Sequence, residues 1–413
     1  DKNASYLKHA DEAVCIGGAK SSESYLNIPA LITAAEMTGC DAIFPGYGFL
    51  SENQDFVEIC KLHNIKFIGP SSEVMEKMAD KSKAKEEMVR AGVPVVPGSK
   101  GAVRTLDEGK KIAREIGYPI MAKASAGGGG RGMRLIKEEK DFDSQYLAAS
   151  SEALAAFGDG TMYLERFINN PRHIEVQVIG DSHGNAIHIG ERDCSLQRRH
   201  QKVIEESPAI LLNDETRAKL HEVAVKATKY LKYEGAGTFE FLADDKQNIY
   251  FMEMNTRLQV EHPVSEMVSG LDIIEWMIKV AEGEKLPPQE SIRFRGHAIE
   301  CRITAEDPNN FLPCPGKITQ WMVPGGRNVR VDSHIYTNYI VPPYYDSMIG
   351  KLIVWGRDRE KAINIMKRAL SEFEVEGIKT NIPFHKKMME NKDFISNNYD
   401  TKYLENYKGL DSI

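Results

Sequence analysis

The stretch Phe251-Met-Glu-Met-Asn-Thr-Arg-Leu-Gln-Val-Glu-His-Pro263 places polar side chains at alternate positions. They are Glu253, Asn255, Arg257, Gln259 and Glu261. Successive side chains of an extended chain point to opposite faces, so these would all share one face. At roughly 3.3 Å per residue, a straight strand would hold Glu253 and Glu261 about 26 Å apart, too far for one reaction centre. We therefore predict that a strand ends near Asn255 and that residues 256–260 curl around a small anion, bringing Glu261 back toward a metal.

The polar residues of this face differ in chemistry in a way that indicates a reaction centre. Glu253 and Asn255 offer the oxygen ligands that Mg²⁺ prefers. The planar guanidinium of Arg257 suits a planar oxyanion, Gln259 adds an amide, and Glu261 is a possible general base.

A second carboxylate lies just upstream. Residues 238–242 and 248–254 are aromatic-rich runs around a polar loop, a pattern typical of a hairpin. Pairing of these strands can place Glu240 beside Glu253, which would give two carboxylates and an amide around one or two cations. Mg²⁺ takes its remaining oxygens from water and nucleotide phosphates. The alternative is a solvated face of an edge hairpin.

Composition limits the class of protein. The chain has 413 residues, of which 42% are hydrophobic and 27% charged, and this suits a soluble protein of two or three domains. Its net charge of −7 argues against a nucleic-acid partner, whose binding surface would be basic. Its six cysteines form no CxxC pair, and no run of 18 apolar residues occurs, so we expect a cytoplasmic protein without disulfides, structural zinc or a membrane span.

Residues 1–78 alternate short apolar strands with helices, which indicates a parallel α/β layer. No strand precedes Asp11, so we expect a unit to be missing before Asp1, together with any targeting signal. The segment Pro45-Gly-Tyr-Gly-Phe-Leu-Ser-Glu52 directly follows a strand, where glycines let the backbone approach a ligand. A tight turn with a packed aromatic side chain is the alternative.

A glycine-rich hairpin follows the first helix of the second domain. Strands over 118–124 and 133–136 flank the tip Ser125-Ala-Gly-Gly-Gly-Gly-Arg-Gly132, whose free N–H groups can wrap phosphates and close over them as a mobile lid. It matches neither a P-loop nor a dinucleotide fingerprint. Lys123 suits a phosphate cation. Lys81 could be another, although a surface lysine is the alternative.

The stretch Glu191-Arg-Asp-Cys-Ser-Leu-Gln-Arg-Arg-His-Gln-Lys202 is densely polar and is expected between strands. Its cations form a positive cluster in an acidic protein, which indicates an anionic ligand. A salt-bridged surface loop is the alternative. The cations are Arg192, Arg198, Arg199, His200 and Lys202.

The rest of the chain supplies helices and a mixed C-terminal region. Asn213 caps a helix that Gly235 is expected to end. Residues 283–288 are typical of a domain boundary. We predict domains at 1–78, 79–281 with a lid over 96–166, and 282–413. Arg302 faces away from Cys301 on a predicted strand, where ion pairing is the default role.

Taken together, four of these motifs resemble the biotin carboxylase family of ATP-grasp enzymes. They are Phe251–His262, Lys123–Met133, Pro45–Glu52 and Glu191–Lys202, and the resemblance continues through Pro342–Lys351 and covers essentially the whole chain. It implies an ATP-grasp fold of mixed α/β and α+β class, with an N-terminal parallel α/β domain, a mobile lid and a mixed C-terminal domain. It also implies that bicarbonate attacks the γ-phosphate of ATP to give carboxyphosphate, whose CO₂ passes to biotin.

The resemblance assigns roles residue by residue. The implied ATP ligands are Lys81, Lys123, Gly129, Gly130, Glu165, Arg166, Phe167, Ile168, His173 and His200. The implied ligands of Mg²⁺ or Mn²⁺ are Glu240, Glu253 and Asn255. Lys202, Arg257, Gln259 and the Val260 amide would bind bicarbonate, with Glu261 as its base. Arg302 would stabilise the biotin enolate near Tyr47.

The resemblance also implies partners. No Met-Lys-Met biotin acceptor is present, so we expect biotin on a separate biotin carboxyl carrier protein and a carboxyltransferase as a third component. A homodimer is expected by resemblance alone. We favour the subunit of acetyl-CoA carboxylase in fatty-acid synthesis. The alternatives are the subunit of a pyruvate or propionyl-CoA carboxylase, another ATP-grasp ligase, and a non-catalytic ATP-binding subunit.

Overall fold

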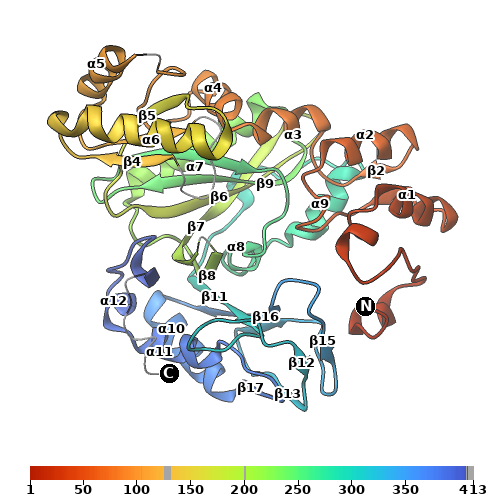
Figure 1. Ribbon diagram of the computed structural model, residues 1–413. Coiled ribbons are helices and arrows are strands. Elements are labelled where there is room, and N and C mark those ends of the chain that lie inside the picture. Colours follow the sequence, from red (N-terminus) through yellow and green to blue (C-terminus); the bar gives the residue numbers. More distant parts are fainter. Residues whose placement is uncertain (104, 125–131, 200, 406, 408–413) are drawn as a thin grey trace.

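An antiparallel sheet of eight strands forms the centre of the computed structural model (Figure 1). The structure describes residues 1–103, 105–124, 132–199, 201–405 and 407, without the side chains of residues 81, 82 and 157. The strands follow the order β10-β9-β6-β7-β8-β11-β16-β14. Their bounds are β6 Arg172–Gly180, β7 Ala186–Arg198, β8 Gln201–Ser207, β9 Gly235–Ala243, β10 Ile249–Asn255, β11 His297–Thr304, β14 Val329–Asp332 and β16 Met348–Gly356.

Helices cover both faces of the sheet. On one face α7 (Asp214–Tyr230) packs against β6 and β7, and α4 (Lys81–Ala91) packs against β10 and α7. On the other face α9 (Ile273–Ala281) packs against β9. The Asn213 side chain accepts from the Thr216 N–H and caps α7, as the sequence predicts. The sheet is therefore buried on both faces here, and the polar side chains within it need partners inside the protein.

The N-terminal layer contains the predicted parallel strands. β1 (Ala42–Ile43) pairs in parallel with β2 (Lys66–Phe67). The helices around this pair are α1 Ile28–Met37, α2 Gln54–Leu62 and α3 Ser72–Ala79, preceded by the short helices η1 Ser5–His9 and η2 Ser21–Glu23. Figure 1 shows this layer beside strand β9, and Glu52 of the loop that follows β1 contacts Thr256 and Arg257 of the central motif.

The lid is a small sheet with helices on one side. Strand β3 (Ile120–Ala124) lies between β4 (Met133–Ile136) and β5 (Met162–Arg166), both antiparallel to it, as the predicted hairpin requires. Helices α5 (Leu106–Ile116) and α6 (Phe142–Phe157) and the short helix η3 (Glu139–Asp141) complete the lid. Its apolar residues form a core of their own, which suits a unit that packs internally.

The C-terminal region builds on the last strands of the central sheet. Helix α10 (Arg359–Glu372) packs on β16 and β11 through Ala362, Met366 and Leu370. The remaining elements are α8 His262–Ser269, α11 Ile382–Glu390, α12 Lys392–Ile395, β12 Gly316–Lys317, β13 Gln320–Met322, β15 Ile340–Val341, β17 Glu374–Glu376, η4 Gln289–Ser291 and η5 Tyr403–Glu405. Because β8 pairs with β11, one sheet runs across residues 283–288, and the domain bounds stay a prediction.

Two expectations are wrong. The polar stretch 191–202 is not a connection between strands, because β7 continues to Arg198 and β8 begins at Gln201. Three of its charged side chains, Glu191, Arg192 and Asp193, are buried against partners, as Asp193 is with Arg172, whereas Arg199 is exposed. Gly235 does not end α7. It opens β9 at φ +86°, where an added Cβ would lie 3.1 Å from the Gly69 Cα, so the position needs glycine.

The central stretch has the predicted shape. Strand β10 ends at Asn255, residues 256–261 form no strand, and α8 begins at His262 directly after Glu261. A bulge between Phe251 and Glu253 shifts the register, and Glu253 then pairs with Glu240 as predicted. No helix among the described residues is long and apolar enough to cross a membrane.

Candidate active site

A cleft of about 1050 Å³ opens beside the β9–β10 hairpin and collects most of the predicted residues. Those at its wall are Tyr47, His173, Lys202, Glu240, Glu253, Asn255, Arg257, Gln259, Val260, Glu261 and Arg302. They come from the N-terminal layer, five strands of the central sheet and the segment before α8. The fold therefore joins residues that lie as much as 255 positions apart in the chain, from Tyr47 in the N-terminal layer to Arg302 in the sheet (302 − 47).

The predicted metal ligands lie side by side on the hairpin. Glu240 and Glu253 are register partners on adjacent strands, and the Asn255 Nδ2 lies 2.7 Å from the Glu240 Oε1. Two carboxylates and an amide are an oxygen-rich set, and the cleft beside them is wide enough to admit a hydrated ion and phosphates. These residues fit Mg²⁺ or Mn²⁺.

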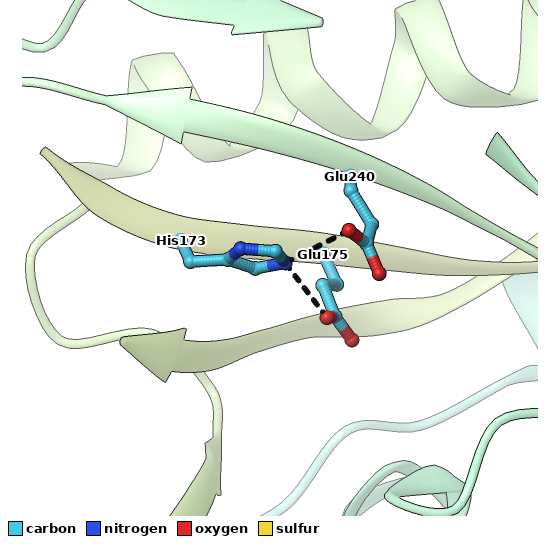
Figure 2. Close-up of side chains that lie close together, drawn as sticks. All are labelled: His173, Glu175 and Glu240. Carbon is cyan, nitrogen blue, oxygen red and sulfur yellow. Dashed lines mark hydrogen bonds and ion pairs between the residues drawn. The ribbon is translucent and has the colours of Figure 1, made fainter. Parts of the chain in front are cut away.

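A second acidic cluster lies beside them, formed by His173, Glu175 and Glu240 (Figure 2). The His173 Nε2 lies 2.9 Å from the Glu175 Oε1 and 3.2 Å from the Glu240 Oε2. Burial would lower the pKa of His173, but the Glu240 charge and both hydrogen bonds outweigh it and raise that pKa to about 9. A protonated imidazole donates hydrogen bonds and cannot ligate a metal, so this cluster positions Glu240.

Lys202 connects three buried carboxylates. Its Nζ contacts Glu175, lies 2.9 Å from the Glu240 Oε1, and lies 2.7 Å from the Glu261 Oε1. Burial opposes its charge, but the carboxylates outweigh burial and raise the pKa of Lys202 well above its ordinary value. A permanent cation therefore stands between the predicted metal ligands and the predicted base.

The predicted oxyanion residues line the turn between β10 and α8. The Arg257 Nε donates to the Glu52 Oε2 at 2.8 Å, and Nη2 lies 3.1 Å from the Asn255 Oδ1. Glu52 also accepts from the Thr256 N–H at 3.0 Å, so one carboxylate of the N-terminal layer holds the turn. Glu52 belongs to the Pro45–Glu52 motif, but nothing in the sequence pattern assigned it to Arg257.

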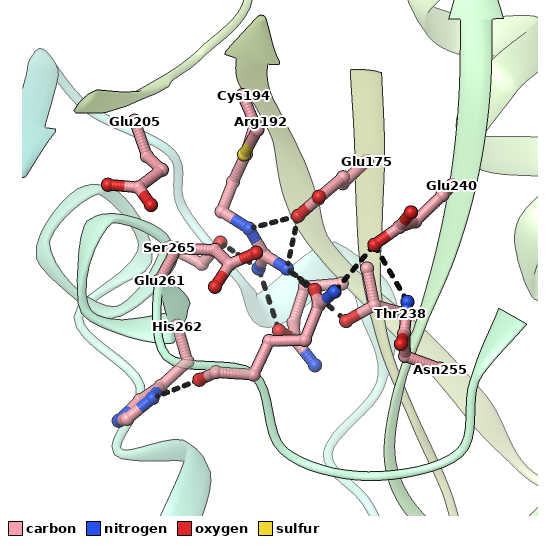
Figure 3. Close-up of polar contacts among 12 residues, drawn as sticks. Glu175, Arg192, Cys194, Glu205, Thr238, Glu240, Asn255, Glu261, His262 and Ser265 are labelled. Atoms are coloured by element: carbon pink, nitrogen blue, oxygen red, sulfur yellow. Dashed lines mark hydrogen bonds and ion pairs between the residues drawn. The ribbon is translucent and has the colours of Figure 1, made fainter. Parts of the chain in front are cut away.

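Gln259 is held by a buried arginine that the sequence pattern misplaced. Arg192 is fully buried, and its Nη2 donates to the Gln259 Oε1 at 2.6 Å (Figure 3). Its other donors reach Glu175, Gln177, Thr238 and Ser265. Because Arg192 binds the amide oxygen, the Gln259 amide nitrogen faces Glu240 and the cleft, at 2.7 Å from the Glu240 Oε1. Arg192 is thus a fixed partner of Gln259, and not an anion-binding cation of a surface loop.

Glu261 lies between two cations. Its Oε1 meets Lys202, and its Oε2 accepts from the Arg302 Nη2 at 2.9 Å. Burial alone would raise the pKa of Glu261, but Lys202 and Arg302 hold it below the usual range. Val260, the residue before it, is fixed by the Lys351 Nζ, which donates to its carbonyl at 2.9 Å.

The predicted nucleotide residues lie along the junction between lid and sheet. Glu165 accepts from the Lys123 Nζ at 2.6 Å and from the Lys85 Nζ at 2.9 Å. The sequence pattern did not predict a role for Lys85, although Lys85 lies one turn after Lys81 in α4. The Arg166 guanidinium donates to the Ile116 carbonyl, the Phe167 N–H to the Pro119 carbonyl, and Ile168 is buried. Gly129, Gly130, His200 and the Lys81 side chain lie outside the described residues.

Tyr47 approaches the same cleft from the N-terminal layer. Its ring is 38% exposed, with the Lys351 Nζ 6.0 Å from the ring centre. Gly46 and Gly48 on either side have positive φ, +63° and +80°, which only glycine adopts readily. The Pro45–Glu52 motif therefore forms a turn that delivers Tyr47 and Glu52 to the site.

The arrangement can hold a metal-bound polyphosphate beside a small planar anion. Oxygen ligands lie on the hairpin, the predicted anion donors on the turn, and the predicted base Glu261 at the end of that turn, all at one cleft. Such a site favours phosphoryl transfer to an oxyanion, because positioning and charge neutralisation supply most of the catalysis in that reaction.

Family comparisons cover nearly the whole chain. Residues 1–75 match the biotin carboxylase N-terminal domain, residues 80–289 the ATP-binding domain of the carbamoyl-phosphate synthase L chain, and residues 300–406 the biotin carboxylase C-terminal domain. The biotin carboxylase of Nostoc is 56% identical over 407 residues, which are 98% of this chain and 91% of that protein.

Solved structures agree in fold. A biotin carboxylase from Campylobacter jejuni in a β,γ-ATP complex has a TM-score of 0.90 and 68% identity, covering 98% of this chain and 91% of that one. The biotin carboxylase domain dimer of Hydrogenobacter thermophilus 2-oxoglutarate carboxylase, in complex with MgADP, ADP and bicarbonate, has a TM-score of 0.87 and 48% identity, covering 100% of this chain and 91% of that one. The mixed α/β architecture predicted from the sequence is confirmed.

Proposed function

The chain belongs to the biotin carboxylase family, and on that premise we propose that it carboxylates biotin with bicarbonate at the expense of ATP. It is an ATP-dependent, ADP-forming ligase. In the first step an oxygen of bicarbonate attacks the γ-phosphorus, ADP leaves, and carboxyphosphate forms. Carboxyphosphate then breaks down to CO₂ and phosphate. The phosphate takes the N–H proton of the biotin ureido group, and the resulting nitrogen nucleophile captures the CO₂.

The observation that carries this proposal is the position of Glu261. Its carboxylate lies between Lys202 and Arg302, next to the turn that holds Arg257, Gln259 and Val260. Glu261 is the base that takes the proton of bicarbonate. The surrounding cations stabilise the carbonate charge that forms as the proton leaves, which offsets the weak basicity of an ion-paired carboxylate.

The bicarbonate site consists of Arg257, Gln259, the Val260 N–H and Lys202. Arg257 offers a planar fork to a planar anion, and Glu52 holds its Nε side. Gln259 donates through the amide nitrogen that Arg192 turns toward the cleft. Binding of bicarbonate draws some donors of Lys202 and Arg257 away from their present carboxylate partners.

The nucleotide lies between lid and sheet. Its proposed ligands are Lys81, Lys123, Gly129, Gly130, Glu165, Arg166, Phe167, Ile168, His173 and His200. Glu240, Glu253 and Asn255 hold Mg²⁺ or Mn²⁺. The bound metal supplies charge neutralisation on the phosphate oxygens and so favours attack at phosphorus. Lys123 and Lys85, balanced by Glu165 in this structure, add cations at the lid side.

Biotin enters the cleft from the side of Tyr47. Arg302 stabilises the enolate of the ureido group, and its guanidinium links that step to Glu261. The biotin arrives on a carboxyl carrier protein and leaves to a carboxyltransferase. We favour acetyl-CoA as the final acceptor, with pyruvate or propionyl-CoA as alternatives, and the Hydrogenobacter relative serves a 2-oxoglutarate carboxylase.

We further propose a homodimer in the cytoplasm with the domain bounds 1–78, 79–281 and 282–413. The dimer is supported by the Hydrogenobacter relative, which is a domain dimer. All six cysteines are free, which suits a reducing compartment.

ATP hydrolysis by the purified protein tests the function. We expect cleavage only with bicarbonate present, and we expect free biotin to stimulate it. Activity in the absence of bicarbonate, or stimulation by an amine in place of biotin, would contradict the proposal and would point to a different ATP-grasp ligase.

A further inference from the structure

Two glutamates face each other in the sheet below Arg302. Glu205 in β8 and Glu300 in β11 are register partners, and both are fully buried. The Arg302 Nε donates to the Glu205 Oε1 at 2.5 Å and its Nη2 donates to the Glu261 Oε2 at 2.9 Å, so the two carboxylates together hold the Nε–Nη2 edge of the guanidinium. Figure 3 shows the Glu205 and Glu261 carboxyls on the same side of the site.

The remaining oxygens of this pair have no protein donor. Neither oxygen of Glu300, nor the Glu205 Oε2, has a hydrogen-bond partner among the described residues. Buried polar atoms are nearly always paired, and two adjacent buried carboxylates cannot both ionise without strong repulsion. A proton shared between the two carboxyls would remove the repulsion and supply the missing donor.

Glu300 forms no ion pair with a described residue, although the charges of Lys351 and Arg302 oppose the rise of its pKa. Arg302 on the same strand binds Glu205 and Glu261, and Lys351 on β16 donates to the Val260 carbonyl. From β8, Lys202 is engaged by three other carboxylates. The other titratable groups that interact with the pair are Glu261 just before α8, Cys194 on β7 and Cys301 on β11.

The electrostatics agree with this geometry. Burial is the main cause that raises the pKa of Glu300 well above its ordinary value, and the Glu205 charge adds to it. Burial also raises the pKa of Glu205, to about 7, against the opposing effect of Arg302. Of the two, Glu205 is the one with a cation in contact, so it is the one that carries the charge.

We infer that Glu205 and Glu300 share one proton, held on Glu300, and that Glu205 is a positioning residue that aims Arg302 at biotin. With Nε fixed by Glu205 and Nη2 by Glu261, the Nη1 of Arg302 is the donor left for the ureido oxygen. Loss of the shared proton at high pH would place a second negative charge beside Arg302, and this charge would compete with the enolate for the guanidinium. The role of Arg302 in this inference rests on the proposed function, whereas the proton shared by Glu205 and Glu300 does not.

Isosteric variants test the role of the pair. E205Q removes the charge beside Arg302, and we expect kcat/KM for biotin to fall about 10- to 100-fold, as for loss of a charged hydrogen-bond partner. E300Q mimics the protonated partner. We expect its biotin-stimulated rate to persist at alkaline pH, where the wild-type rate declines. D181N, which removes a buried carboxylate in the β6–β7 turn, is the matched control for charge loss and folding. We expect it to keep the wild-type biotin response and pH profile.

A wild-type biotin response in E205Q, or an alkaline decline that remains in E300Q, would overturn the positioning role. Infrared difference spectra test the proton without turnover. We expect the carbonyl band of a protonated carboxylic acid in the wild type and its loss in E300Q. Absence of that band in the wild type, or its persistence in E300Q, would overturn the shared proton. Absence of any biotin stimulation in the wild type would instead contradict the proposed function.

Discussion

The carboxylate of Glu261 and the guanidinium of Arg302 form a direct ion pair, with the Oε2 2.9 Å from the Nη2. The two residues are proposed for different half-reactions, the first for bicarbonate and the second for biotin. If these proposed roles hold, carboxyphosphate forms next to the group that stabilises the acceptor, and the CO₂ released there meets biotin before it can escape into solvent.

Replacement of Glu261 by glutamine is predicted to abolish bicarbonate-dependent ATP cleavage. The amide keeps the shape of the side chain but cannot take a proton. The substitution also removes the negative charge that pairs with Lys202 and Arg302. Steady-state rates measure the loss, and binding of a fluorescent ATP analogue serves as the control for an intact nucleotide site. Near-normal turnover would remove Glu261 from the mechanism.

Glu52 should govern bicarbonate affinity from outside the central motif. E52Q weakens the bond to the Arg257 Nε and the bond to the Thr256 N–H, so the guanidinium loses its fixed orientation. We expect KM for bicarbonate to rise about tenfold, the effect of one charged hydrogen bond. The exposed Glu73 in α3 gives the matched variant E73Q, for which no change is expected. Equal kinetics of the two variants would refute this role for Glu52.

Glu253 should control the metal requirement. E253Q removes one of two carboxylates of the hairpin pair. Loss of an outer-shell partner alone lowers metal affinity about 10- to 100-fold, so we expect the Mg²⁺ concentration for half-maximal activity to rise at least about tenfold. Mg²⁺ titration at saturating ATP measures it. An unchanged titration curve would show that Glu253 does not bind the metal.

Acid stability should depend on Glu191, a buried carboxylate on β7 whose partners Arg217 and His221 belong to α7. Burial would raise its pKa, but hydrogen bonds from His221 and Arg217 outweigh burial and lower it to about 2. Because this pKa is below the unfolded value of 4.5, the stabilisation is present above pH 4.5 and is lost as the pH falls toward 2.

The variant E191Q tests this linkage by thermal unfolding. We expect it to be about 3 kcal/mol less stable than the wild type at pH 7, the cost of breaking a buried ion pair. That difference should shrink as the pH falls from 4.5 toward 2. A difference that stays constant over this range would exclude the Glu191 charge as its source.

The local features of the site could be predicted from the sequence because short-range pattern determines them. Side-chain alternation and a loop of turn residues placed Glu253 opposite Glu240, and the spacing from Glu253 to Glu261 required the chain to turn after Asn255. The glycine-rich hairpin of β3 and β4 followed from strands that closely flank a run without side chains.

The partners of these residues could not be predicted, because they depend on how distant strands lie in one sheet. The polarity of residues 191–202 predicted a cation cluster for an anionic ligand, with a surface loop as the alternative. Arg192 is instead fully buried, and its partners include a carboxylate of β6, a hydroxyl of β9 and an amide of the turn before α8. Glu205 and Glu300 meet only because β8 pairs with β11, across 95 residues of chain (300 − 205). The sequence pattern of a polar strand, whose buried charges pair with residues of other elements, is the same as that of a surface loop.

Oxygen-18 transfer tests the central claim most directly. The protein is incubated with ATP, Mg²⁺, biotin and bicarbonate labelled with ¹⁸O, and the released phosphate is analysed by mass spectrometry. Attack of bicarbonate on the γ-phosphorus places one labelled oxygen in each phosphate, and E261Q should release none. Unlabelled phosphate from the wild type under turnover would show that water attacks ATP, and it would contradict a carboxyphosphate intermediate in this site.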